Sequence, residues 1–255
     1  MRLLHLTLLG LVLTAHPASA QLSRDCPDCP AMIELPSGAA MATTLVTRDM
    51  FSVFAEETQF PEQPDCVLRT DKRFQKTDGA NWQNPGFEQA GDHPVVCVTW
   101  LDATAYADWL SETTGRLYRL PTWEESVEAT AAGSETAFWW GDDFANVCEN
   151  ANVADAAYRE IFPEDPRNIL ECSDGHAHTA PVTAFPANAW GIHDAAGNVW
   201  QWTNSCVGGD CSNAIFRGGA WTVPNPKHLR SDGQWADRVR LRNNAIGFRV
   251  MRDPD

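Results

Sequence analysis

Tryptophan is the feature that most constrains the fold of this chain. The sequence holds eleven tryptophans in 255 residues. Many of them stand close to glycine, proline or asparagine rather than at the spacing of a helix face, as at Trp82, Trp140, Trp200 and Trp221. Large rings bury much apolar area each, so a core built from them needs few regular elements. We therefore expect an irregular, loop-rich core with most tryptophans inside it.

Length and composition favour one exported domain. Apolar residues make up 44% of the chain, enough for a packed core. The first 20 residues have the pattern of a signal peptide, with Arg2, a short apolar stretch over 3–13 and small residues before Gln21. No other segment is long and apolar enough to cross a membrane. We predict a leader at 1–20, a single domain at 21–255 and a periplasmic or secreted location.

Charge excludes one class of partner. The net charge is −15, and nucleic acid binding requires a basic patch, so no nucleic acid partner is expected. One C-terminal segment is basic against this background. Its arginines are Arg230, Arg238, Arg240, Arg242, Arg249 and Arg252. Pairing with nearby carboxylates is the interpretation we favour, and a groove for an anionic or peptide ligand is the alternative.

Local signals predict three helices and few strands. Thr47 begins a helix that runs through Glu57, and a second helix covers 101–113 before Gly115. A capping box at Thr122–Glu125 begins a third, which continues to Ala132. We expect short strands at 95–98 and near 200–203, 215–218 and 247–251. The segment 59–94 is rich in Pro, Asp, Gln and Gly and is predicted to be a surface loop.

Four sequence blocks carry a family resemblance. They are YRLPT at 118–122, GIHDAAGNVWQW at 191–202, FRGGAW at 216–221 and IGFR at 246–249. Together they resemble the formylglycine-generating enzyme, or sulfatase-modifying factor, superfamily. The resemblance covers about residues 26–252. It implies an α+β fold related to C-type lectins, with little regular secondary structure.

The resemblance also shows what this chain lacks. Family members with oxidase activity have a serine in the RGGSW block and two copper-binding cysteines after it. Here these positions are Ala220, Val223 and His228. Because Cu(I) is held by soft thiolate ligands, we expect no copper and no formylglycine generation. The resemblance leaves Trp200 and Trp221 at the pocket, which should be apolar and lined also by Val223 and Pro224.

Two structural calcium sites are implied by the same resemblance. Calcium binds carboxylate, amide and carbonyl oxygens. The first site would use the Asn152 side chain, the Val153 carbonyl, the Asp174 carboxylate and the His176 carbonyl. The second would use the Asp194 side chain, the Gly197 and Val199 carbonyls, and Gln201, where relatives carry Glu. The alternative is a set of loops rich in Asn and Asp that bind no ion.

Eight cysteines follow residue 20, and an even number in an exported chain favours disulfides. The resemblance implies the pairs Cys66–Cys97, Cys148–Cys172 and Cys206–Cys211. A reactive thiol pair is the less favoured alternative for the last of these. Cys26 and Cys29 lack the strand-to-helix context of a redox dithiol, so a local disulfide or free thiols are expected there.

Histidines offer one further metal hypothesis. His176 and His178 are two residues apart, which on a strand would place both rings on one face. No 2-His-1-carboxylate spacing accompanies them, so we favour a structural role over a metal site.

The functional prediction has two forms. In the first, the chain is a pseudoenzyme of this family that binds a protein or peptide in the periplasm, as a regulator or accessory factor. In the second, it is a periplasmic maturation oxidase similar to the members that act on pyoverdine siderophores or accompany nitrite reductases. An exposed apolar patch near Trp200 and Trp221 would favour the binder. Convergent polar groups there would favour the enzyme.

Overall fold

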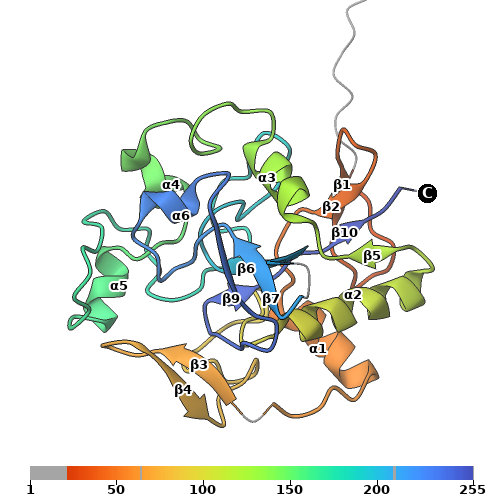
Figure 1. The fold of residues 1–255 in the computed structure, drawn as a ribbon, viewed down its shortest axis with the longest axis horizontal. Coiled ribbons are helices and arrows are strands. Elements are labelled where there is room, and N and C mark those ends of the chain that lie inside the picture. Colours follow the sequence, from red (N-terminus) through yellow and green to blue (C-terminus); the bar gives the residue numbers. More distant parts are fainter. Residues whose placement is uncertain (1–21, 64, 209–210, 255) are drawn as a thin grey trace, which may run out of the picture.

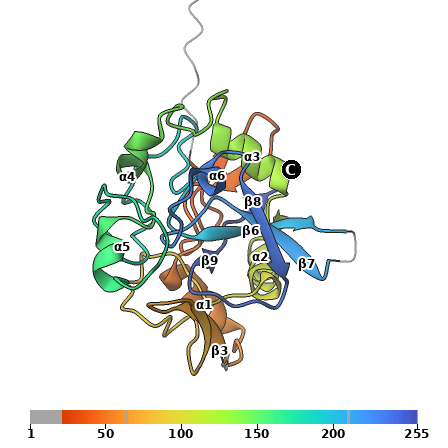
Figure 2. The ribbon, with the colours of Figure 1, turned by 60° about the vertical axis from the view of Figure 1, so that its left-hand side comes forward.

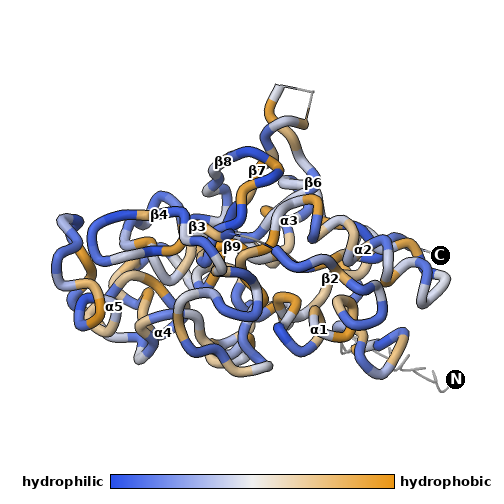
Figure 3. Tube along the Cα trace, turned by 90° about the horizontal axis from the view of Figure 1, so that it is seen from below, coloured by the Kyte–Doolittle hydropathy of each residue, from blue (hydrophilic) through white to orange (hydrophobic). Residues whose placement is uncertain are grey.

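The computed structural model describes residues 22–63, 65–208 and 211–254. The predicted leader at 1–20 lies outside these ranges. Regular elements are short and are joined by long irregular segments, as expected from the sequence (Figure 1). No helix in the described ranges is both long enough and apolar enough to span a bilayer. Figure 3 shows polar and apolar residues interleaved along the chain.

Two four-stranded sheets organise the molecule. The first has the order β1 (Met32–Glu34), β2 (Ala40–Ala42), β10 (Met251–Arg252) and β5 (Tyr118–Arg119). It is antiparallel throughout and pairs Met251 with both Met41 and Arg119. The second has the order β8 (Gln234–Arg238), β7 (Asn213–Arg217), β6 (Trp200–Cys206) and β9 (Ile246–Gly247). Only its β6–β9 pair is parallel. The β6–β7 hairpin projects from the body of the molecule (Figure 2).

The three predicted helices are confirmed. They are α1 (Arg48–Glu57), α2 (Trp100–Thr114) and α3 (Trp123–Ala131). Thr47 caps α1 through its side chain, and Gly115 ends α2 in the left-handed conformation at φ 70°. Both hydrogen bonds of the predicted capping box form at α3. Four shorter helical elements follow: η1 (Phe144–Asn146), α4 (Val147–Asn150), α5 (Ala156–Ile161) and α6 (Pro226–Leu229).

Two predictions about strands were wrong. The segment 59–94 is not a plain loop, because it contains the hairpin of β3 (Asp65–Arg69) and β4 (Phe74–Asp78). Its polar composition arises because β4 lies mostly exposed. The segment 95–98 is fully buried but forms no strand. The backbone N–H of Val95 donates to the Val46 carbonyl, and that of Cys97 donates to the Asn243 carbonyl, so its partners lie in two different segments.

Aromatic rings fill the core, but the prediction that most tryptophans lie inside it was wrong, because only Trp109, Trp202 and Trp221 of the eleven are buried. Phe51 of α1 contacts Phe54 edge to face at 5.1 Å and stacks on Tyr106 of α2 at 6.0 Å. A separate cluster forms around the fully buried Trp221. Such edge-to-face pairs add stability beyond the area they bury.

All eight cysteines are paired. The structure confirms the three predicted disulfides and forms Cys26–Cys29 as a fourth. It therefore resolves the alternative at Cys26 in favour of a local disulfide. Cys206 and Cys211 likewise form a loop disulfide rather than a thiol pair.

Candidate functional site

A cavity of about 330 Å³ lies between the β3–β4 hairpin and the second sheet. We call it the aromatic cleft. Its aromatic walls are Phe74 of β4, Trp200 of β6, Phe216 of β7, His228 of α6 and Trp235 of β8, and Arg167 adds a guanidinium. Five separate elements and one loop therefore contribute these residues to one space.

The rings of the aromatic cleft contact one another edge to face. Trp200 lies 5.3 Å from Phe216 and 5.5 Å from His228, and His228 lies 5.6 Å from Trp235. Two of the wall residues are also unusually exposed, since Trp235 is 55% and Phe74 41% accessible to solvent. Large exposed aromatic side chains at a concave site are typical of a binding surface.

The positions at which the resemblance would place copper-binding cysteines lie beside this cleft. Val223 and His228 line a neighbouring cavity of about 590 Å³, together with Pro224. Arg167 and His228 border both spaces. The structure thus brings together the two residues predicted to replace the thiols, whereas Ala220 is fully buried nearby. Because every cysteine in the chain is in a disulfide, no free thiol is available here.

Trp200 and Trp221 have different roles. Trp200 lines the aromatic cleft, but Trp221 is fully buried and supports the site from within. The Trp221 ring packs against Tyr158 and Phe162 at 5.9 Å each, and its indole N–H donates to the Asn244 carbonyl. The predicted pocket beneath Trp221 is therefore an aromatic core.

His178 belongs to the same core. Its ring stacks on Phe87 at 4.4 Å and meets Trp221 edge to face at 5.1 Å. Burial lowers the pKa of His178 to about 4, so the ring is neutral at pH 7. Across the described ranges, no three His, Cys, Asp or Glu side chains are grouped as a metal would require. These contacts favour the structural interpretation of the His176–His178 pair.

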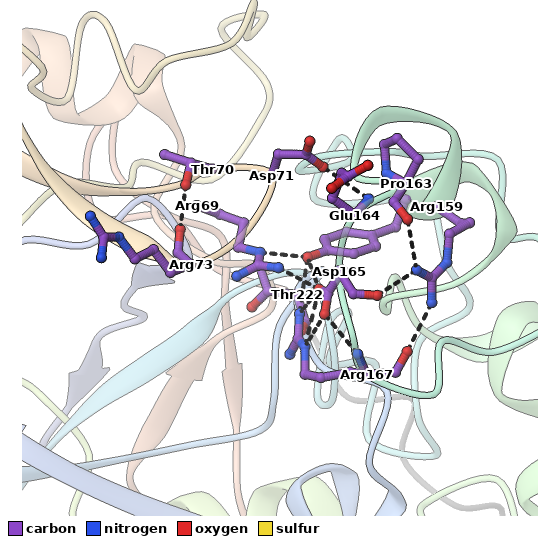
Figure 4. A network of polar contacts seen from close by, with 11 residues as sticks. Arg69, Thr70, Asp71, Arg73, Arg159, Pro163, Glu164, Asp165, Arg167 and Thr222 are labelled. Carbon is purple, nitrogen blue, oxygen red and sulfur yellow. Dashed lines mark hydrogen bonds and ion pairs between the residues drawn. The ribbon is translucent and has the colours of Figure 1, made fainter.

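A buried polar network holds Arg167 at the cleft (Figure 4). The carboxylate of Asp165 accepts hydrogen bonds from Arg69, Arg167 and the Tyr158 hydroxyl. Burial raises the pKa of Asp165, but the bonds from Arg167 and Tyr158 outweigh that effect, and the net pKa is well below its usual range. Burial also raises the pKa of Tyr158 to about 12, and its bond to Asp165 acts in the same direction.

Sequence reasoning missed Arg167, Phe74 and Trp235. These residues lie far apart in the chain and meet only because the hairpin, the loop after α5 and β8 fold against one another. The available signal was weak: Asp165 and Arg167 are two residues apart, a spacing at which a carboxylate can hold a guanidinium in a turn.

The residues of the first predicted calcium site lie together. Asp174 accepts the backbone N–H of Val153 at 2.7 Å and that of His176 at 2.8 Å. Asn152 is fully buried, and its side-chain oxygen has no hydrogen-bond donor. Burial raises the pKa of Asp174 to about 7, and repulsion from Asp155 adds to this rise. An unpaired buried oxygen beside a destabilised carboxylate is an environment that suits a cation.

The second predicted site is less suited to an ion. One oxygen of Asp194 is buried without a donor, and burial raises the pKa of this group to about 7. However, the Gln201 side-chain oxygen already accepts from the Arg249 guanidinium at 2.6 Å. Arg249 also donates to the Asp194 carbonyl at 3.0 Å. Gly197 and Val199 lie in the same buried turn. A guanidinium therefore already supplies positive charge among these groups.

The basic C-terminal segment is largely paired, as we favoured. Salt bridges join Arg230 to Asp232, Arg238 to Asp237, Arg242 to Asp102 and Arg252 to Asp25. Some of these residues also border a second cavity, of about 620 Å³, which we call the basic cavity. Its cationic lining is Lys76, Arg238, Arg240 and Arg242.

Comparison with known proteins gives consistent matches. The family described as sulfatase-modifying factor enzyme 1-like domain matches residues 17–254. A formylglycine-generating enzyme of Streptomyces coelicolor is 35% identical over 133 residues, which is 49% of this chain and 37% of that protein. The inactive C-alpha-formylglycine-generating enzyme 2 of Bos taurus is 33% identical over 150 residues, which is 56% of this chain and 44% of that protein. The matches thus span less than half the length of these curated relatives.

A solved structure supports the fold. The structure of PvdO from Pseudomonas aeruginosa superposes with a TM-score of 0.75 and 24% identity, covering 93% of this chain and all of that one. The mixture of helices and strands in this chain agrees with the predicted α+β class.

Proposed function

The chain belongs to the sulfatase-modifying factor enzyme 1-like family, and we propose that it binds a peptide or protein partner in the aromatic cleft without generating formylglycine. The main support is the pair of exposed rings, Phe74 and Trp235, that line the same cavity as Trp200. Aromatic anchors in a concave site contribute most of the binding free energy in many interfaces.

The residues beside the cleft argue against oxidase chemistry of the copper type. Val223 offers a metal no lone pair, and a single imidazole at His228 does not replace two thiolates. The cysteines are held in four disulfides. The likeness to a bovine relative named as inactive is consistent with this proposal.

A selection from a random peptide display library tests the binding proposal. We expect the wild-type protein to enrich a common motif, and Trp235→Ala to weaken the selected peptides by roughly tenfold or more. Leu117→Ala is the matched control, because Leu117 is an exposed apolar residue that does not line the cleft. Failure to enrich any motif, or equal weakening by both variants, would refute the proposal.

Export is the second part of this proposal. The leader pattern and the four disulfides support a location outside the cytoplasm, in the periplasm or medium, where the protein would act as a regulator or accessory factor. Mass spectrometry of the protein from its native host should show a chain that starts at Gln21 with no free thiol. A full-length cytoplasmic form with reduced cysteines would contradict it.

A maturation oxidase is the second candidate function. One observation favours it: Arg167, His228 and Asp237 bring polar groups to the cavity that holds Trp200. Such convergence is expected of a reaction centre. Oxygen consumption measured with a selected peptide separates the two candidates, since a binder should consume none above the protein-free rate.

We also propose one structural calcium ion at the first set of ligands, where the side-chain oxygen of Asn152 has no donor in the described chain and burial raises the pKa of Asp174 to about 7. Its role would be to hold the loop after α4 against the loop at Asp174, which Cys148–Cys172 also joins.

A further inference from the structure

We propose that the ligand of the aromatic cleft carries a carboxylate, which binds to Arg167. This inference rests on the proposed function, because it names the chemical group that the cleft selects. It is carried by the charges and the hydrogen bonds of the network in Figure 4.

The network contains more positive than negative charge. Two guanidiniums, Arg69 and Arg167, share the single carboxylate of Asp165, and the third partner, Tyr158, is a neutral phenol. Asp165 is buried and so is Arg69. An uncompensated charge in such a place is costly unless an opposite charge comes near it. The network therefore presents one net positive charge that a bound anion would balance.

Only one of the two guanidiniums faces the cleft. Arg69 is enclosed, since its guanidinium lies 5.5 Å from the ring centre of Phe74 and 5.8 Å from that of Phe162. The Arg167 side chain is 37% exposed and lines both the aromatic cleft and its neighbouring cavity. The surplus charge is therefore accessible at Arg167.

The hydrogen bonds of Arg167 leave one donor for a ligand. A guanidinium has five N–H groups. Nε donates to the Asp165 carboxylate at 3.0 Å, and Nη2 donates to Asp165 at 2.6 Å and to the Tyr158 hydroxyl at 2.9 Å. Nη1 donates to the Thr222 carbonyl at 2.7 Å. Among the described residues no partner takes the second Nη1 hydrogen. Arg167 is thus fixed before binding, which lowers the entropy lost when a ligand binds.

The surroundings strengthen this contact and restrict the ligand. The rings of Trp200 and Trp235 line the same cavity as Arg167, and less polar surroundings increase the attraction between opposite charges. Asp237 also lines the cleft, but its carboxylate lies 3.7 Å from the Arg238 guanidinium, which offsets its charge. A carboxylate flanked by an apolar group matches these walls. In a peptide it is either a Glu or Asp side chain or the C-terminal group.

The basic cavity is the competing anion site. Its charges are mostly balanced in place, because Lys76 lies 2.6 Å from Asp65 and Arg242 lies 3.1 Å from Asp102. Arg240 also lines this cavity and is exposed, and no carboxylate among the described residues forms a salt bridge with it. Arg240→Gln is therefore a matched control, since it removes one positive charge from the same face of the protein without touching the aromatic cleft.

The decisive experiment compares two probes of one shape, 3-phenylpropionate and 3-phenylpropionamide, by NMR titration of the folded protein. We expect the acid to bind about tenfold more tightly than the amide, because only the acid forms a charge-assisted bond. Arg167→Gln should remove this preference, and Arg240→Gln should retain it. Arg167→Lys keeps the positive charge but loses the planar set of guanidinium N–H donors, so the preference of this variant for the acid over the amide should be intermediate. If the Gln variant does not fold, the Lys variant provides the test.

Selected peptides then identify the source of the carboxylate. Each is made with a free or an amidated C-terminus, and with Glu or Gln at its acidic positions. If amidation lowers the affinity, the C-terminal carboxylate is the group that binds Arg167. If replacement of Glu by Gln lowers it, the group is an acidic side chain. Equal affinity of acid and amide probes, or a preference removed by Arg240→Gln and not by Arg167→Gln, would overturn the inference. Neutral peptides that bind through Trp235 as tightly as acidic ones would overturn it while leaving the proposed function intact. If no peptide binds, both fail together.

Discussion

At the scale of single residues, two of the buried oxygens that lack a hydrogen-bond donor belong to predicted calcium ligands. The side-chain oxygen of Asn152 and one oxygen of Asp194 have no donor. Leaving such a group unpaired costs about 1–3 kcal/mol, so proteins usually satisfy it with water or an ion. The two atoms lie in the two predicted calcium sites. Because Arg249 already stands at the second, the first is where an ion should have the larger effect.

Removal of calcium should therefore destabilise the protein. A ligand that binds only the folded state raises its stability by mass action. We expect a chelator to lower the melting temperature, and Asp174→Ala to remove most of that response. Gln201→Ala is the comparison at the second site, and it should leave the chelator response unchanged. A melting curve that chelation does not move, in protein shown to be metal-free, would contradict the calcium proposal.

The same carboxylate predicts a pH dependence. The pKa of Asp174 is raised from 3.8 to about 7, so the folded, ion-free protein binds this proton more tightly than the unfolded chain. Protonated Asp174 therefore adds to the free energy of unfolding. This contribution is complete below about pH 4 and is lost as the pH rises to about 7. Buried histidines such as His178, with a lowered pKa, act in the opposite direction.

A comparison of variants isolates this contribution. Chelated wild-type protein and Asp174→Asn are melted at about pH 5 and about pH 8. The histidine effect is common to both and cancels in the difference. We expect the wild type to lose more stability than the variant over this range, and calcium to abolish the difference. If the stabilities of the wild type and the variant changed equally with pH in the absence of calcium, the pKa of Asp174 would not be raised as described.

At the scale of secondary-structure elements, those fixed by residues within or next to the element could be predicted from the sequence, and those that depend on remote residues could not. The helices were predictable because Thr47, Thr122 and Gly115 act on their own turns. The β3–β4 hairpin was not, because its partners are remote: Val67 bonds to Arg242 and Asn244. The same difference between local and remote signals decided which residues of the site could be predicted. Val223 and His228 followed from a family motif, whereas Phe74 and Trp235 meet only through tertiary packing.

The helix α3 offers a local test. The Thr122 hydroxyl accepts the Glu125 N–H, and the Glu125 carboxylate accepts the Thr122 N–H at 2.8 Å. Replacing an N-cap threonine by alanine typically costs about 1 kcal/mol. We expect that loss for Thr122→Ala in denaturant unfolding, and close to none for Thr122→Ser. A loss of equal size in both variants would mean that packing of the threonine methyl, not the cap, stabilises the helix.

The hairpin depends on its disulfide. Cys66 of β3 is bonded to Cys97, 31 positions along the chain, and a bridge that closes a loop of this size contributes about 3 kcal/mol. We expect the double variant Cys66→Ala/Cys97→Ala to lose stability and also to weaken peptide binding, because Phe74 and Arg69 belong to this hairpin. The control is Cys26→Ala/Cys29→Ala, which should leave peptide binding unchanged. If both pairs affected binding equally, the effect would be global rather than confined to the hairpin.

At the scale of the whole molecule, the chain retains the fold of its family. PvdO superposes over 93% of this chain, yet Ala220, Val223 and His228 offer no thiol or serine at the expected centre. The remaining cavity is lined by rings and one guanidinium. These features are the basis of the proposal that the cleft binds a partner rather than supporting copper-dependent oxidation.

This difference has a direct assay. Incubation of the protein with Cu(I), oxygen and a Cys-x-Pro-x-Arg peptide should yield no formylglycine above the protein-free background, because soft ligands for Cu(I) are absent from the cleft. A formylglycine-generating enzyme serves as the positive control, and mass analysis of the peptide detects the aldehyde. Aldehyde formation by this protein would overturn the central proposal and direct attention to Cys206 and Cys211.

The first sheet links the molecule's assembly to the order of its synthesis. Strand β2 cannot gain its neighbour β10 until Met251 has been made, because Met41 pairs with it across nearly the entire chain. Each disulfide, by contrast, joins cysteines no more than 31 positions apart. The nascent chain can therefore complete every covalent link segment by segment while its final sheet is still open. Proximity along the chain is therefore enough to select the correct thiol partners, and pairing of the last strand is not required for it.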